Sequence, residues 1–251
     1  MNGLAPISNP KPWVMSMRWE DLAFLHWPVP IAALEAHIPQ GLRLDTFAGH
    51  AWVGVVPFRM AGVRARGLPE VPGTNDFLEL NLRTYVTDGS RPGVWFFSLD
   101  CENLLAVRGA RVGFSLPYFD AHIKSLESDL PAIDLAESDN PSFEYSSRRT
   151  HRGSPGATFR ATYSPNSSPF LTEPGTLEHW LTSRYCLYAQ RPSGRVIRGE
   201  ILHRPWALQT CKVELLENTL CDSLGFKLPS EPVLAHFAKR LEVQAWLPTG
   251  I

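Results

Sequence analysis

The sequence predicts a mainly β protein of the α+β class, folded as a sandwich or barrel. Three observations support this prediction. About ten segments have the length and apolar pattern of strands, Gly- and Pro-rich turns separate them, and only two or three short helices are indicated. The 251 residues are 44% apolar and 11% aromatic, which suffices for a packed core, and no repeat or long linker divides them. We therefore expect a flexible N-terminal arm over residues 1–12 and one domain over residues 13–251.

The segment FLELNLRTYV, residues 77–86, has the clearest strand pattern. Its even positions are mostly apolar, whereas its odd positions carry Glu79, Asn81, Arg83 and Tyr85. This period of two predicts a strand with one apolar and one polar face. A central strand seldom presents a carboxylate and a guanidinium unless water or a ligand lies against them. We therefore expect a cavity on the polar face.

Further elements follow from the same reasoning. Residues 94–99 are uniformly apolar, as in a strand covered on both sides. One helical turn is expected at 103–108, followed by a strand that ends at Leu116-Pro117-Tyr118. Short helices are expected after Pro30 and Thr176, strands at 119–126, 195–203 and 208–216, and a hairpin over 143–163. A long loop is expected over residues 61–76.

Several classes of function are disfavoured. The formal net charge of −1 and the scattered basic residues argue against binding of nucleic acid. The eight histidines show no metal-ligand spacing, and the motifs of nucleotide, zinc-protease and serine-hydrolase sites are missing. We expect no metal and no cofactor. No apolar run is long enough for a signal peptide or a membrane span, and the four cysteines form no Cys-x-x-Cys pair. A cytoplasmic protein with free thiols and no membrane contact is the expectation.

Six segments resemble one protein family: WEDLAFLHWPVP, DTFAGHAWVGVVPFRM, FLELNLRTYV, GVWFFSLD, ARVGFSLPY and RYCLYA. Together they span roughly residues 13–216 and are similar to the YqjF-like family of uncharacterised bacterial proteins, which is grouped with the acetoacetate decarboxylase-like superfamily. The resemblance implies antiparallel strands curled into a barrel or cone around a central cavity, with a few short helices. Superfamily relatives often form oligomers, and this chain permits a homo-oligomer without indicating one.

The resemblance carries over only part of the superfamily's chemistry. Glu79 resembles the cavity glutamate of the decarboxylases, and Arg111 and Gly113 resemble the segment before their Schiff-base lysine. Here, however, the sequence reads Leu116-Pro117-Tyr118, with a tyrosine in place of the lysine. Decarboxylation through an imine needs an amine as electron sink, and tyrosine cannot supply one. Lys124 could substitute only if the site were shifted.

The candidate site residues each have a structural alternative. Glu79 and Tyr118 are the candidate catalytic pair, although Glu79 could equally form an ion pair with Arg83, and Tyr118 could be a buried tyrosine with a backbone partner. The candidate substrate-binding residues, each of which could instead be structural, are Arg83, Tyr85, Arg111, Arg184 and His203. In this scheme Arg83 would hold an anionic group.

Two functions remain open from the sequence. In the first, the cavity binds a small organic acid or carbonyl compound, and Glu79 and Tyr118 transfer protons in a lyase or isomerase reaction without an imine. In the second, the protein is a non-catalytic binding or sensing module that kept the cavity after losing the lysine. Membership of a superfamily does not decide between them, because one fold hosts many functions.

Overall fold

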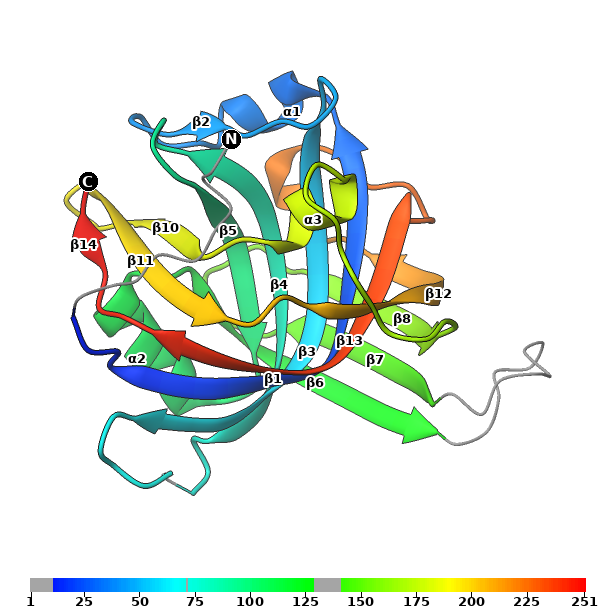
Figure 1. Cartoon of the computed structure of the whole chain (residues 1–251), viewed down its shortest axis with the longest axis horizontal. Coiled ribbons are helices and arrows are strands. Elements are labelled where there is room, and N and C mark those ends of the chain that lie inside the picture. The colour runs from blue at the N-terminus through cyan, green and yellow to red at the C-terminus, as the bar shows by residue number, and fades with distance from the viewer. Residues whose placement is uncertain (1–10, 71, 129–140) are drawn as a thin grey trace.

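The computed structural model describes residues 11–70, 72–128 and 141–251, so most of the expected N-terminal arm lies outside it. Within these ranges fourteen strands form one large curled sheet (Figure 1). The strands of the first half are β1 (Met15–Val29), β2 (Arg43–Leu44), β3 (Ala51–Ala65), β4 (Asp76–Thr87), β5 (Pro92–Cys101), β6 (Tyr118–Ser128) and β7 (Ser142–Arg149). Those of the second half are β8 (Thr158–Pro165), β9 (Phe170–Leu171), β10 (Cys186–Gln190), β11 (Val196–His203), β12 (Ala207–Asn218), β13 (Leu234–Ala245) and β14 (Thr249–Gly250).

Three helices lie among these strands. They are α1 (Ile31–Glu35), α2 (Leu104–Phe114) and α3 (Leu177–Thr182), and a 3₁₀ turn follows at Asp222–Leu224. The Thr176 hydroxyl accepts a hydrogen bond from the His179 N–H at the start of α3, which confirms the helix expected there. The mainly β prediction is confirmed.

The strand pairings close two circuits that share five strands. The first circuit contains seven strands. Each strand pairs with the next in the order β10, β5, β4, β3, β1, β13 and β11, and β11 pairs with β10 to close the circuit. The second circuit runs from β5 through β6, β7, β8 and β12 to β13, and returns through β1, β3 and β4. The shared strands are therefore covered on both faces.

The alternation along β4 divides its side chains between two interiors. Leu80 and Leu82 belong to the core that fills the second circuit, with aromatic residues of β7 and β8 such as Phe143 and Phe159. Phe77 belongs to the core of the seven-strand circuit. Glu79 and Asn81 share the Phe77 face of the strand, because successive side chains point to opposite faces. The polar face that the sequence predicts is thus directed into the seven-strand circuit.

The prediction of a strand immediately before Tyr118 is wrong. Residues 104–114 form the eleven-residue helix α2, where the sequence indicated one helical turn and then a strand. The reason is topological: β5 and β6 pair in parallel, Leu99 opposite Tyr118, and parallel neighbours need a crossover connection, commonly a helix. The Asn103 side chain accepts hydrogen bonds from the N–H groups of Leu105 and Ala106 and so caps the helix.

The loop predicted over residues 61–76 is longer than the connection in the structure. The hairpin of β3 and β4 continues to Ala61 opposite Asp76, and β3 runs on to Ala65, so the connection is residues 66–75. The hairpin of β7 and β8 and the strands expected after residues 119, 195 and 208 are present as predicted. Of the helices in the described ranges, none is long and apolar enough to cross a bilayer.

Candidate functional site

A cavity of about 340 Å³ lies inside the seven-strand circuit, and one face of α2 covers it. All seven strands of the circuit contribute aliphatic or aromatic side chains to its wall. Its polar side chains are few: Glu79, Asn81, Thr74, Tyr118 and the indole of Trp19. The volume and the apolar wall with a few convergent polar groups are those of a small-molecule site.

Glu79 and Tyr118 meet in the wall of this cavity. The Tyr118 hydroxyl donates a hydrogen bond of 2.8 Å to Oε2 of Glu79. Glu79 is 2% exposed and Tyr118 7% exposed, so the pair is removed from bulk water. Tyr145 donates to the backbone carbonyl of Glu79 at 2.9 Å and holds this part of β4 from the opposite core. The structure therefore brings together the two residues predicted as the catalytic pair.

Burial controls the protonation of both groups. Burial raises the pKa of Glu79 from 4.5 to about 8, and the hydrogen bond from Tyr118 opposes this shift only in part. Burial and the neighbouring Glu79 carboxyl raise the pKa of Tyr118 well above its ordinary value of 10. At neutral pH Glu79 is thus mainly a neutral carboxylic acid, which can donate a proton from the oxygen that Tyr118 does not contact.

Two further polar atoms in the cavity wall are buried and have no hydrogen-bond partner among the described residues. They are Oδ1 of Asn81 and Nε1 of Trp19. A buried polar atom without a partner costs about 1–3 kcal/mol, so both atoms are available to a ligand that carries polar groups.

Arg83 is not among the residues that line the cavity, contrary to the expectation that it binds an anionic group of the substrate there. It lies four residues beyond Glu79, which corresponds to roughly 14 Å along a strand. Among the described residues no ion pair joins Arg83 to Glu79. The alternative of a structural Glu79–Arg83 salt bridge is therefore wrong as well.

Four predicted substrate-binding residues instead gather near α3. Nη2 of Arg83 lies 3.3 Å from the Tyr85 hydroxyl, and the Arg184 guanidinium lies over the Tyr85 ring at 4.8 Å. Nε2 of His203 lies 3.3 Å from the Arg184 carbonyl oxygen, and its Nδ1 lies 2.7 Å from that of Arg204. Burial lowers the pKa of His203, so this imidazole is neutral at pH 7. It is held by backbone groups, and the structure places it outside the cavity wall.

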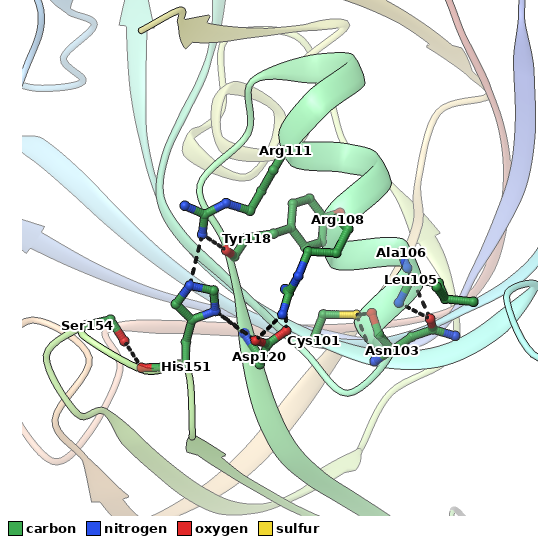
Figure 2. A network of polar contacts seen from close by, with 10 residues as sticks. All are labelled: Cys101, Asn103, Leu105, Ala106, Arg108, Arg111, Tyr118, Asp120, His151 and Ser154. Atoms are coloured by element: carbon green, nitrogen blue, oxygen red, sulfur yellow. Dashed lines mark hydrogen bonds and ion pairs between the residues drawn. The ribbon is translucent and has the colours of Figure 1, made fainter.

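Arg111 lies on the outer side of α2 and anchors the helix to β6 (Figure 2). Its Nη1 donates to the backbone carbonyl of Tyr118 at 2.7 Å and lies 3.4 Å from Nε2 of His151. Arg108, one turn earlier, makes two bonds of 2.7 and 2.8 Å to the Asp120 carboxylate, which also contacts His151. Arg111 thus holds the backbone of Tyr118 from outside the cavity, in agreement with the structural alternative.

Two features of the cavity escaped the sequence reasoning. Met15, Met17 and Met60, which are all the methionines of the described chain, line it. Gly109 of α2 also lines it, and a Cβ added there would meet no other atom within 4 Å. The methionines alternate with polar residues on β1, which is a signal of a shared face, but nothing in the sequence places β1 in the same circuit as β4. Thioether side chains suit a cavity that adapts to its ligand.

No lysine lines the cavity among the described residues, and Lys124 is exposed on β6. The four cysteines are free, as expected. Groups of three or more histidine, cysteine or acidic side chains able to hold a metal do not occur in the described ranges. The arrangement can therefore bind a small apolar molecule and exchange a proton with it through Glu79, and the described cavity wall offers no amine for an imine.

Comparison with known proteins agrees with this architecture. Residues 16–242 match the model of the family DUF2071, described as "Uncharacterized conserved protein". The chain is 44% identical over 234 residues to "Uncharacterized protein YqjF" of Bacillus subtilis (strain 168), which covers 93% of this chain and 91% of that protein.

Solved structures with low sequence identity share the fold. The enduracididine biosynthesis enzyme MppR complexed with pyruvate has a TM-score of 0.61 at 14% identity, covering 97% of this chain and 91% of that one. An acetoacetate decarboxylase-like enzyme from Sphingomonas wittichii RW1 has a TM-score of 0.61 at 13% identity, covering 96% and 94%. The chain therefore has an acetoacetate decarboxylase-like fold.

Proposed function

Because this chain belongs to the DUF2071 family of uncharacterised conserved proteins and has an acetoacetate decarboxylase-like fold, we propose that its cavity binds a small, apolar carbonyl compound. The observation that carries this proposal is a buried carboxyl group, hydrogen-bonded to a buried tyrosine, in a cavity whose described lining contains no cationic side chain. A ligand carboxylate in this cavity would be desolvated without a counter-ion. Of the organic acids and carbonyl compounds expected from the sequence, the carbonyl compounds fit better.

In the proposed reaction Glu79 acts first as an acid and then as a base. The neutral carboxyl donates its proton to the ligand's carbonyl oxygen, and the resulting carboxylate removes a proton from the carbon next to the carbonyl. The net change is the conversion of the ketone to its enol, with all atoms retained. Tyr118 stabilises the carboxylate through its hydrogen bond while the charge exists. This is isomerase-type chemistry without an imine.

The first experiment measures exchange of the α-protons of 2-heptanone in D₂O by NMR at pH 7. We expect the wild-type protein to accelerate this exchange. Glu79→Gln should bind 2-heptanone with similar affinity, but its exchange rate should be at least about 100-fold lower, because general acid–base catalysis contributes on that scale. Lys212→Gln, on β12 outside the cavity wall, is the control and should keep the wild-type rate.

The alternative function, a non-catalytic binding module, predicts a different result in the same experiment. Its support is the absence of any lysine from the described cavity wall. Binding of 2-heptanone with exchange no faster than in buffer would favour this module over an enzyme. Failure of 2-heptanone to bind, or its displacement from the cavity by a lower concentration of heptanoate, would overturn the carbonyl proposal.

A second prediction uses the two glycines of α2. Gly109→Leu should place a side chain in the cavity and weaken 2-heptanone binding at least tenfold, because position 109 lines the cavity and has open space around it. Gly113→Leu is the matched control, since a side chain there also meets open space but the residue does not line the cavity. Both variants should fold at least as stably as the wild type, because leucine favours a helix more than glycine does. Calorimetric titration would measure both affinities, and equal binding by the two variants would place the ligand elsewhere.

A further inference from the structure

We propose that Arg83 is the centre of a second binding site, specific for a planar monocarboxylate, which lies beside α3 and is separate from the cavity. The site consists of Arg83, His26 and Tyr85, with Arg184 behind Tyr85. None of these four residues lines the cavity. The inference therefore goes beyond the proposed function and does not depend on it.

The guanidinium of Arg83 has more donors than partners. Nη2 makes two long contacts, 3.3 Å to the Tyr85 hydroxyl and 3.5 Å to the Leu181 carbonyl oxygen of α3, and Nε is buried without a hydrogen-bond partner. Among the described residues no carboxylate lies within salt-bridge distance of Arg83. A guanidinium offers five N–H donors in a planar fork, which matches the two oxygens of a carboxylate.

Among the residues that the structure describes, the charges around Arg83 leave one positive charge without a partner. Arg184 is 4% exposed and pairs with Asp45, so its charge is balanced within the protein. His26 is fully buried, and burial together with the charge of Arg83 lowers its pKa well below 6.5, so it is neutral at pH 7. The cluster therefore carries a net charge of +1 from Arg83. A monoanion balances this charge, whereas a phosphate dianion would exceed it.

Two other residues of the site, both in contact with Tyr85, also carry unpartnered atoms. Nε2 of His26 lies 2.7 Å from the Tyr85 hydroxyl, which fixes the ring, while Nδ1 of His26 is buried with no partner. Nη2 of Arg184 is also buried without one. Several such atoms in one place cost free energy in the empty protein. Aromatic faces complete the surroundings, since the Arg83 guanidinium lies 5.2 Å from the Phe24 ring centroid and 5.6 Å from that of Tyr85.

Gly54 of β3 holds this arrangement in place. A Cβ at this position would lie 3.2 Å from two atoms of the His26 ring and 3.4 Å from Cγ of Arg83. The backbone of β3 thus packs directly against both side chains, which allows little movement. A site held in its binding geometry loses less entropy when it takes up a ligand.

Benzoate is the probe for this site, and its neutral isostere benzamide tests the need for charge. We expect one benzoate per chain in calorimetric titration, benzamide to bind at least tenfold more weakly, and Arg83→Gln to weaken benzoate at least tenfold. Arg83→Lys should recover only part of the affinity, because lysine keeps the charge but not the fork. Arg160→Gln, an exposed arginine on β8, should bind benzoate as the wild type does.

Three results would overturn the proposal. They are equal benzoate affinity in wild type and folded Arg83→Gln, no saturable benzoate binding by the wild type, and tighter binding of inorganic phosphate than of benzoate. Circular dichroism and a cooperative melt establish folding of each variant, and Arg83→Lys provides the test if Arg83→Gln does not fold. Gly109→Leu separates the two sites, since it should weaken 2-heptanone binding at least tenfold and leave benzoate binding unchanged.

Discussion

Glu79→Gln is expected to remove about 3 kcal/mol of pH dependence from the free energy of unfolding between pH 5 and pH 7.5. The figure follows from a carboxyl pKa of about 8 in the folded protein against 4.5 in the unfolded chain, at 1.36 kcal/mol per pH unit. Glutamine cannot ionise but keeps an oxygen that accepts the Tyr118 hydrogen bond, so the folded structure should be retained.

The direction of the effect follows from proton binding. The folded protein keeps the Glu79 proton up to about pH 8, whereas the unfolded chain loses it above pH 4.5. The stabilising contribution is therefore complete below pH 4.5 and is lost as the pH rises towards 8. Burial lowers the pKa of His26, His203 and His236, and these residues act in the opposite direction, losing stability as the pH falls. They are present in both proteins, so the difference between wild type and variant isolates Glu79.

Urea unfolding at pH 5.0, 6.5 and 7.5 measures this difference. The wild type should lose stability relative to Glu79→Gln at each step towards higher pH. Glu144→Gln, on the exposed side of β7, is the matched control and should follow the wild-type curve. Parallel curves for wild type and Glu79→Gln would show that Glu79 is ionised in the folded protein, and proton donation by Glu79 would then be excluded.

Arg149→Met should destabilise the protein by about 3–5 kcal/mol at pH 8, because it leaves a buried carboxylate without its partner. Nε of Arg149 lies 2.7 Å from Oδ1 of Asp100, and the two side chains are 4% and 1% exposed. Burial raises the pKa of Asp100 even with Arg149 in place. Without Arg149 the folded protein favours protonated Asp100 still more, so the loss should be smaller at pH 5 than at pH 8.

The double variant Asp100→Asn/Arg149→Met separates the lost ion pair from lost packing. With no charge left in the core, it should recover most of the stability that Arg149→Met loses, since a buried pair is often replaceable by neutral groups. Arg59→Met is the comparison for an exposed pair, Arg59 with Asp76, and should cost no more than about 1 kcal/mol. A double variant as unstable as Arg149→Met would show that the destabilisation comes from the lost packing of the arginine stem and not from the lost ion pair.

The sequence was sufficient to predict the strand β4 and the pair formed by its Glu79 with Tyr118. The alternation from Leu78 to Val86 predicts a strand with one polar face, and the structure directs this face into the seven-strand circuit. The resemblance to the YqjF-like family added Tyr118 at the position of the superfamily lysine, and Tyr118 does contact Glu79. These predictions succeeded because a strand's side-chain period is a local property and a motif is read directly from the sequence.

The position of Arg83 and the course of α2 depended on the tertiary structure. Arg83 shares a strand face with Glu79, but the circuit is long enough to divide this face between the cavity and the cluster near α3. Residues 110–114 are helical because β5 and β6 pair in parallel and need a crossover between them.

The sequence by itself determined the mainly β class, the polar face of β4 and the family. Only the tertiary structure decided which polar residues meet, that three methionines and Gly109 complete the cavity, and that Arg83 has no counter-ion among the described residues. The physical reason is that strand periodicity depends on neighbouring residues, whereas cavities and charge pairs depend on contacts between segments far apart in the chain. Glu79 and Tyr118, thirty-nine residues apart, are one such contact.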